Sequence, residues 1–194
     1  MGAEASGKAF LGVIAYIKVQ YGTKRLNQII ALSGELTQKL FSEKIELLRW
    51  YPYEAFAQFL ETIQARLSNG DPNYCRILGT LAGEKDLAST FAVYKAQKNP
   101  ERFVRSCGFL WSSYYRNAGE MVVVSYSPNK TVVRINNFPH MNINHCRVTE
   151  GWISTTLPAI GYKVTDYRET QCMCLGGPYH EFVFSAQGTI PLID

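Results

Sequence analysis

The chain has 194 residues, of which 46% are apolar, and a formal net charge of +4 at neutral pH. This length is sufficient for one hydrophobic core and favours a single globular domain over two small ones. The 20 Lys and Arg residues are scattered without a dense basic run, and no apolar run reaches the ~20 residues of a membrane span. We therefore expect neither a nucleic-acid partner nor a transmembrane segment.

The first eight residues lack the positive and then apolar regions of a secretory signal, which predicts a cytoplasmic protein. The five cysteines are an odd number: Cys75, Cys107, Cys146, Cys172 and Cys174. In a reducing compartment such residues are more often buried thiols or metal ligands than disulfides.

Helical periodicity dominates the N-terminal half of the chain. Apolar residues recur at helical spacing from Lys8 to Gln20, and Tyr21-Gly22 should end this helix. A second helix is expected from Thr23, and another from Tyr53 to Leu67. Proline suits the first turn of a helix, where a missing N–H is harmless, and three prolines open helical patterns here: Pro52, Pro72 and Pro100.

Strand patterns enter in the C-terminal half. β-branched residues fill Met121 to Tyr126 and Thr131 to Ile135, which predicts a hairpin. A helical pattern follows from Cys146 to Ile160, and a second hairpin is expected from Tyr162 to Cys172 and Tyr179 to Phe184. The sequence thus predicts an α+β fold with a helical layer packed on an antiparallel sheet of four to five strands, in the order helices, hairpin, helix, hairpin.

Side chains that bind metals are densest in the last third of the chain: His145, Cys146, Glu169, Cys172, Cys174 and His180. Twenty-two residues separate Cys146 from Glu169, two separate Glu169 from Cys172, and seven separate Cys172 from His180. Thiolates, an imidazole and a carboxylate form a ligand mixture that Zn²⁺ accepts. These four residues are therefore a candidate zinc site, with Cys174 or His145 as a replacement if Glu169 points away.

The strand pattern argues against this site in part. A regular strand turns alternate residues to opposite faces, so Glu169 and Cys172 share a site only if a bulge intervenes. The simpler hypothesis is that Cys172 and Cys174 are core thiols and that His180 is an ordinary residue of a turn.

Aromatic residues along the helices are candidates for lining an apolar ligand cavity, although aromatic stripes at helical spacing usually form core. The candidate ligand-binding residues are Trp50, Tyr53, Phe56, Phe59, Trp111, Tyr114 and Tyr115. No Gly-x-Ser-x-Gly motif or phosphate-binding loop occurs in the sequence. A nucleophile pair of Cys146 or Cys107 with one of the three histidines stays open as an enzymatic alternative.

The stretch HCRVTEGWISTTLPAIGYKVTDYRETQCMCLGGPYHEFVF, from His145 to Phe184, resembles the end of the 4-vinyl reductase-type small-molecule-binding domain. Upstream segments are similar to a paralogous family, expanded in myxobacteria, that shares this terminal motif: RWYPYEAFAQFLETI, GTLAGEKDLASTF and GFLWSSYYRNAGEMVVVSYSPNKTVVRINNFP. The resemblance implies the fold of vesicle-tethering subunits of the transport protein particle type. It also implies a single domain over residues 7–186, a C-terminal tail over 187–194, and a homodimer.

In aromatic-sensing activators that carry this domain, a structural zinc is held by a Cys, a Glu and two further Cys residues. Cys146, Glu169 and Cys172 match three of these positions, and the fourth falls on His180, which is a departure from the family pattern. The resemblance therefore implies a structural Zn²⁺ on these four residues.

We expect a regulatory or sensory module that binds a hydrophobic or aromatic small molecule and passes the change to a protein partner. The alternative is a dimeric protein-interaction scaffold whose interior is filled by side chains. Reductase chemistry is not implied, because the sequence shows no recognisable nicotinamide or flavin motif.

Overall fold

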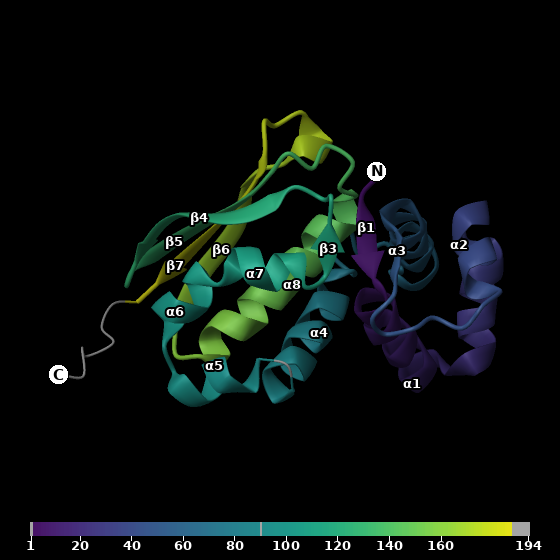
Figure 1. Ribbon diagram of the computed structural model, residues 1–194, viewed down its shortest axis with the longest axis horizontal. Helices are drawn as coiled ribbons and strands as arrows, with labels where there is room; N and C mark the ends of the chain where they lie inside the picture. The colour runs from purple at the N-terminus through teal and green to yellow at the C-terminus, as the bar shows by residue number, and fades with distance from the viewer. Residues whose placement is uncertain (1, 90, 188–194) are drawn as a thin grey trace.

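The computed structural model describes residues 2–89 and 91–187 (Figure 1). Its helices are α1 (Gly7–Leu32), α2 (Glu35–Phe41), α3 (Tyr53–Leu67), α4 (Arg76–Ala88), α5 (Ala92–Gln97), α6 (Pro100–Arg105), α7 (Cys107–Ser112) and α8 (Ile143–Ala159), with a 3₁₀ turn η1 (Met173–Leu175). Its strands are β1 (Glu4–Ser6), β2 (Trp50–Pro52), β3 (Tyr115–Arg116), β4 (Glu120–Ser127), β5 (Lys130–Asn136), β6 (Val164–Gln171) and β7 (His180–Ala186).

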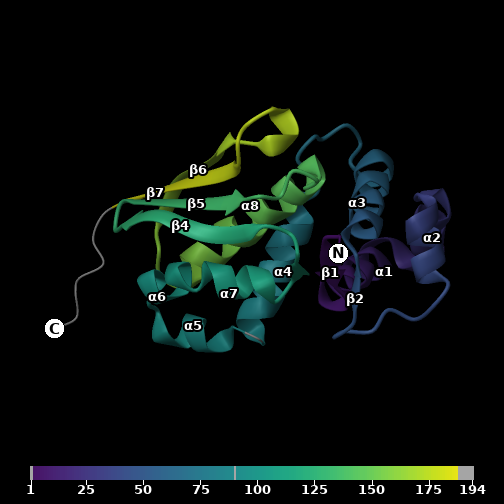
Figure 2. The ribbon, with the colours of Figure 1, turned by 45° about the horizontal axis from the view of Figure 1, so that its top comes forward.

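The larger sheet has the strand order β4-β5-β7-β6, and every neighbouring pair is antiparallel. The two predicted hairpins are β4–β5 and β6–β7, joined through β5 and β7 at the centre of the sheet. Figure 2 shows helices α4 to α8 gathered on one face of this sheet. The predicted α+β fold, with a helical layer on an antiparallel sheet, is confirmed.

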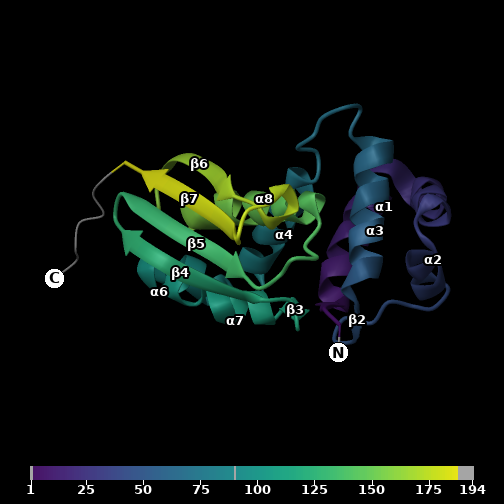
Figure 3. The ribbon, with the colours of Figure 1, turned by 90° about the horizontal axis from the view of Figure 1, so that it is seen from above.

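Helices α1, α2 and α3 lie beyond one end of the larger sheet, as the view from above shows (Figure 3). Within α1 the backbone leaves the helical conformation at Gly22, where φ is +80°. This kink lies where the sequence predicts a helix end, and glycine adopts a positive φ without the steric cost that a side chain would add. The first part of α1 buries Phe10, Val13 and Ile17 in the core.

A second, three-stranded sheet of order β2-β1-β3 joins segments far apart in the chain, and the sequence analysis did not predict it. Each of these strands has only two or three residues, which is too short for a detectable alternation of polar and apolar side chains. The sheet ties the start of α1 to the segments before α3 and after α7.

Helices α4 and α8 pack with their backbones in close contact. A Cβ atom added at Gly79 would lie 1.8 Å from the carbonyl oxygen of Val148, and one added at Gly151 would lie 2.0 Å from that of Arg76. Both separations are far below van der Waals contact, so only glycine permits this packing. The position of α8 under the sheet therefore depends on these two residues.

The expected single domain over 7–186 is preceded here by β1, which pairs with β2 and β3 from residue Glu4 onward. Apart from Gln187, the expected tail over 187–194 lies outside the described residues. Within the described chain, no helix has the combination of length and apolar composition that crossing a bilayer requires.

Candidate functional site

A cavity of about 170 Å³ lies between α1, α4, α8 and the segment from α7 to β3. Most of its wall is apolar or aromatic, and two lysines, one aspartate and one histidine also reach it. The lining residues are Lys8, Ala9, Gly12, Val13, Leu47, Phe56, Leu78, Ala82, Lys85, Asp86, Leu110, Trp111, Tyr114, Tyr115, Met121, His145, Val148, Thr149 and Trp152. The combination of an apolar wall with a few polar groups is typical of small-molecule sites.

Aromatic rings pack face to face at one side of the cavity. The indole of Trp111 stacks on the imidazole of His145, with ring centroids 5.6 Å apart and an interplanar angle of 13°. Tyr115 packs against both rings at centroid distances of 4.5 Å. This wall is rigid, since each ring is held by at least one aromatic neighbour.

His145 is buried and neutral. Burial, together with the smaller effect of the nearby His180, lowers its pKa to about 3. Its Nδ1 lies 3.0 Å from the hydroxyl of Tyr53, which accepts a hydrogen bond from the backbone N–H of Asn142. The hydroxyl proton of Tyr53 is therefore available for Nδ1, and we assign the imidazole proton to Nε2.

A buried carboxylate marks the opposite, polar end of the cavity. Asp86 is 4% exposed, and both of its oxygens lie 2.6 Å from the hydroxyl of Tyr114, which donates to them. The indole N–H of Trp152 also donates to Asp86, at 2.9 Å. Such bonds to an ionised acceptor compensate the cost of burying its charge.

Four of the seven predicted ligand-binding residues line the cavity: Phe56, Trp111, Tyr114 and Tyr115. Three lie elsewhere. Tyr53 contacts His145, Phe59 packs on Phe41 within the N-terminal helices, and Trp50 lies in β2 against the guanidinium of Arg116.

The sequence analysis did not place Lys8, Asp86, His145 or Trp152 in the cavity. A signal for Asp86 was present, because it falls four and eight residues after Ala82 and Leu78, on the apolar stripe of α4. A carboxylate on an apolar stripe needs a buried partner, and here Tyr114 and Trp152 provide it.

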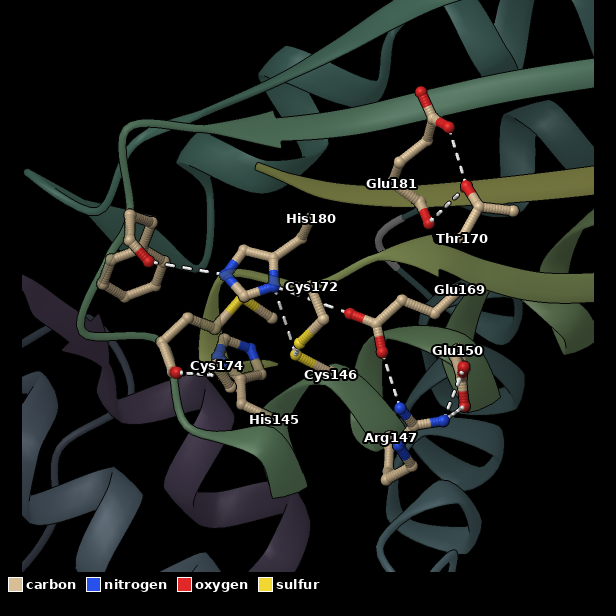
Figure 4. Close-up of polar contacts among 12 residues, drawn as sticks. His145, Cys146, Arg147, Glu150, Glu169, Thr170, Cys172, Cys174, His180 and Glu181 are labelled. Atoms are coloured by element: carbon tan, nitrogen blue, oxygen red, sulfur yellow. Dashed lines mark hydrogen bonds and ion pairs between the residues drawn. The ribbon is translucent and has the colours of Figure 1, made fainter. Parts of the chain in front are cut away.

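A cluster of thiols and an imidazole, which we call the thiol cluster, lies on the other side of the start of α8 (Figure 4). Its members are Cys146, Cys172, Cys174 and His180, whose ligand-type atoms all lie within 4.8 Å of one another. The Sγ of Cys146 is 3.8 Å from the Sγ of Cys172 and 3.4 Å from the Nδ1 of His180.

Glu169 lies beside the thiol cluster, and Cys174 is the fourth member of the group instead. One carboxylate oxygen of Glu169 accepts a hydrogen bond from Arg147 at 2.6 Å, and the other lies 3.5 Å from the Nδ1 of His180 (Figure 4). The register of β6 against β7 shifts between Glu169 and Gln171, which is the bulge that strand alternation requires here. Cys174 comes into the group from the η1 turn, where its thiol donates to the carbonyl of Met141 at 2.8 Å.

The thiols of the cluster differ in acidity. A hydrogen bond from Cys146 lowers the pKa of the Cys172 thiol to about 6, against the opposing effect of burial. The same contact, together with one to Cys174 and burial, raises the pKa of Cys146. Cys172 is therefore the nucleophilic thiol of this pair near neutral pH.

No protein-family model and no curated protein sequence matches the chain. Solved structures of H-NOX proteins are similar to it over nearly its whole length. An H-NOX protein from S. oneidensis in the Fe(II)NO ligation state has a TM-score of 0.72 and 12% identity, covering 94% of this chain and 99% of that one. An Fe(II) unliganded H-NOX protein from K. algicida has a TM-score of 0.71 and 13% identity, covering 95% and 98%. A structure from a study of heme distortion in the H-NOX family has a TM-score of 0.67 and 10% identity, covering 97% and 98%.

The chain therefore has the fold seen in H-NOX proteins. This corrects the family that the sequence suggested, since the similar structures are neither 4-vinyl reductase-type domains nor tethering-complex subunits. The quoted segments cover parts of helices α3, α4 and α8 and two hairpins, with aromatic and thiol residues. Unrelated families that place helices on an antiparallel sheet can share such a pattern, so it carries little family information.

The expectation of a structural Zn²⁺ is also corrected. The metal named for the similar structures is iron, as Fe(II) or heme. The thiol cluster groups metal-binding residue types, but the expectation of zinc rested on the family that the comparison overturns.

The residues around the cavity do not fit a heme. An engineered cavity of ~150 Å³ holds one benzene molecule, and a macrocycle of four pyrrole rings is several times larger than the 170 Å³ found here. Among the polar groups of the wall, Tyr114 donates to Asp86 and therefore does not present a free oxygen to a metal. Burial raises the pKa of Tyr115, so it is a neutral phenol rather than an iron-binding phenolate.

Proposed function

We propose that this chain is a sensory or regulatory module that binds one small hydrophobic or aromatic molecule in the cavity between α1, α4, α8 and the α7–β3 segment. The observation that carries the proposal is the cavity itself: about 170 Å³, walled by stacked rings and closed at one end by a satisfied carboxylate. Its volume suits a single substituted aromatic ring.

Binding would stabilise the packing of the two halves of the molecule. The cavity wall combines Gly12 and Val13 of α1 with Val148 and Trp152 of α8, so a ligand contacts elements from both halves at once. A ligand that binds only the folded state at one hundred times its Kd adds about 2.7 kcal/mol to the free energy of unfolding. For a chain of this size that is a rise in Tm of about 5–10 °C.

Thermal unfolding with benzene, toluene, styrene and indole tests the proposal. The matched variants are Gly12→Leu and Ala15→Leu, both in α1. Gly12 belongs to the cavity wall, and a Cβ atom added there would meet no atom within 4 Å. Ala15, in contrast, is exposed. We expect at least one compound to raise the Tm of the wild type and of Ala15→Leu but not of Gly12→Leu. Equal responses of the two variants, or no response to any compound, would contradict the proposal.

The proposal extends to one domain over residues 7–186 and to a protein partner that senses the change, with a second copy of the chain as the first candidate. Large apolar side chains at the surface support a partner, among them Leu48, Phe109 and Leu175 at 85%, 68% and 79% exposure. Light scattering with and without a bound aromatic compound tests it, because a monomer mass under both conditions would exclude self-association.

A further inference from the structure

Lys8 brings a positive charge to the polar end of the cavity. Its ammonium lies 4.0 Å from the ring centroid of Tyr114 and 5.3 Å from that of Phe91, so two aromatic faces hold it in place. Burial lowers the pKa of this ammonium, which the charge of Asp86 partly opposes. Among the described residues, no carboxylate oxygen lies within 4.0 Å of it.

Asp86, the buried acid in the wall, already has hydrogen-bond donors for both of its carboxylate oxygens. Tyr114 and Trp152 donate to its two oxygens, and its side chain is almost fully covered. A second ammonium, that of Lys85, also reaches the cavity. Because Lys85 is exposed to solvent and Asp86 already accepts hydrogen bonds from Tyr114 and Trp152, the half-buried ammonium of Lys8 is the positive charge that a ligand would meet here, while His145 at the aromatic wall is neutral.

We infer that the ligand of this cavity is an aromatic monocarboxylate, whose ring packs on the wall of Trp111 and whose carboxylate pairs with Lys8. The inference rests on the proposed function and specifies the chemistry of the ligand. An apolar molecule alone would cover the half-buried ammonium of Lys8 and leave it only its contacts with aromatic faces, which compensate less of the cost of removing it from water than an anion would. A carboxylate offers the charge-assisted hydrogen bond that compensates this cost.

The volume is consistent with this class. A cavity of 170 Å³ exceeds the ~150 Å³ that benzene occupies in an engineered core by a margin that suits one small substituent. Since Lys8 supplies a single charge, a dicarboxylate or a phosphate dianion would carry more negative charge than this ammonium balances.

Calorimetric titration with three probes of similar shape separates the charge from the shape: benzoate, benzamide and toluene. We expect the wild type to bind benzoate at least tenfold more tightly than benzamide, and Lys8→Met to lose this preference while it retains toluene. Lys8→Arg keeps the charge and should keep the preference. Lys85→Met, at the edge of the same end, should reduce it less than Lys8→Met does.

The outcomes distinguish the two proposals. Toluene binding with equal affinities for benzoate and benzamide would overturn the inference and leave the proposed function intact. Binding of none of the three probes to folded wild-type protein would overturn both. If Lys8→Met does not fold, the preference of the wild type and its weakening by 0.5 M NaCl decide the question, because screening reduces a charge-dependent preference.

Discussion

The cavity and the thiol cluster begin at adjacent residues of one helix, yet they are opposite kinds of environment. His145 faces the cavity, where it is neutral, stacked and hydrogen-bonded to a phenol. Cys146 faces the thiol cluster, where sulfur atoms, an imidazole and a carboxylate interact within a few ångströms. Successive residues of a helix point about 100° apart, so one turn of α8 can serve both.

The two regions compensate the cost of burying polar groups in different ways. In the cavity, the buried carboxylate of Asp86 has neutral partners in Tyr114 and Trp152. Beside the thiol cluster, Arg147 instead holds two buried carboxylates, those of Glu150 and Glu169. The stability of the cavity region should therefore depend on packing and on a bound ligand. The properties of the thiol cluster should depend on which of its groups are ionised.

The largest expected effect comes from removing the charge that serves the thiol cluster. Glu150 and Glu169 are only 4% and 5% exposed, so Arg147→Met leaves two carboxylates buried without their cation. We expect a loss of about 3–5 kcal/mol in the free energy of unfolding, measured by urea denaturation. Arg168→Met is the matched control, because Arg168 is exposed and lies 3.9 Å from Asp166; its loss should stay below about 0.5 kcal/mol. Equal losses of unfolding free energy in the two variants would show that Arg147 has no special role in compensating the buried carboxylates.

A smaller effect is expected from His145 as the pH falls. Its folded pKa of about 3 lies below the ordinary value of 6.5, so the unfolded chain binds a proton that the folded chain does not. The contribution of His145 to the free energy of unfolding is fully present above pH 6.5 and is lost as the pH falls toward 3. The loss amounts to about 2 kcal/mol at pH 5.

His145→Gln isolates this contribution from that of the carboxylates. The variant should be less stable than the wild type at pH 7.5, and the gap should narrow by about 2 kcal/mol at pH 5. A gap that does not change with pH would show that His145 titrates normally in the folded protein.

The thiol cluster should show a difference in reactivity rather than in stability. With a pKa of about 6, Cys172 is roughly 90% ionised at pH 7, whereas burial raises the pKa of Cys107 to about 11. Iodoacetamide labelling followed by peptide mass spectrometry should therefore modify Cys172 well before Cys107. In Cys146→Ala, the midpoint of the pH profile for Cys172 should move upward, because the hydrogen bond that stabilises its thiolate is gone. An unchanged midpoint would contradict this assignment.

The cavity should show no change on exposure to heme. Because its volume is several times smaller than that of a porphyrin, we expect no stoichiometric heme absorption band after incubation with hemin and gel filtration. A one-to-one complex with a sharp band would show that the cavity opens far beyond the arrangement described here.

Much of the fold follows from local patterns in the sequence. The helix from Tyr53 to Leu67 was predicted from the spacing of its apolar residues, and the start of α6 from Pro100. The hairpin of β4 and β5 follows from β-branched runs separated by turn residues, and that of β6 and β7 from two strand segments separated by the turn at Gly176-Gly177-Pro178. These signals act over a few residues, so they persist whatever the rest of the chain does.

The residues of the candidate sites could be predicted only in part from such local patterns. The residue types of Cys146, Cys172 and His180 pointed to one group, but the choice of Cys174 over Glu169 depended on a bulge and a 3₁₀ turn. The family expected from the quoted segments was wrong, because those segments contain no motif whose chemistry is specific to one family.

Tertiary structure alone decided the cavity and its polarity. Lys8, Asp86, Tyr114 and Trp152 are separated by up to 144 positions in the chain, and β1 pairs with strands more than forty residues away. Contacts of this range depend on how α4 and α8 close on each other at Gly79 and Gly151, which local periodicity does not encode. The sequence by itself determined the longer helices and the four strands of the larger sheet, but not the short strands β1, β2 and β3. The volume between them, and the charge left unpaired in it, arise only when those segments pack, because both depend on side chains brought together from distant elements.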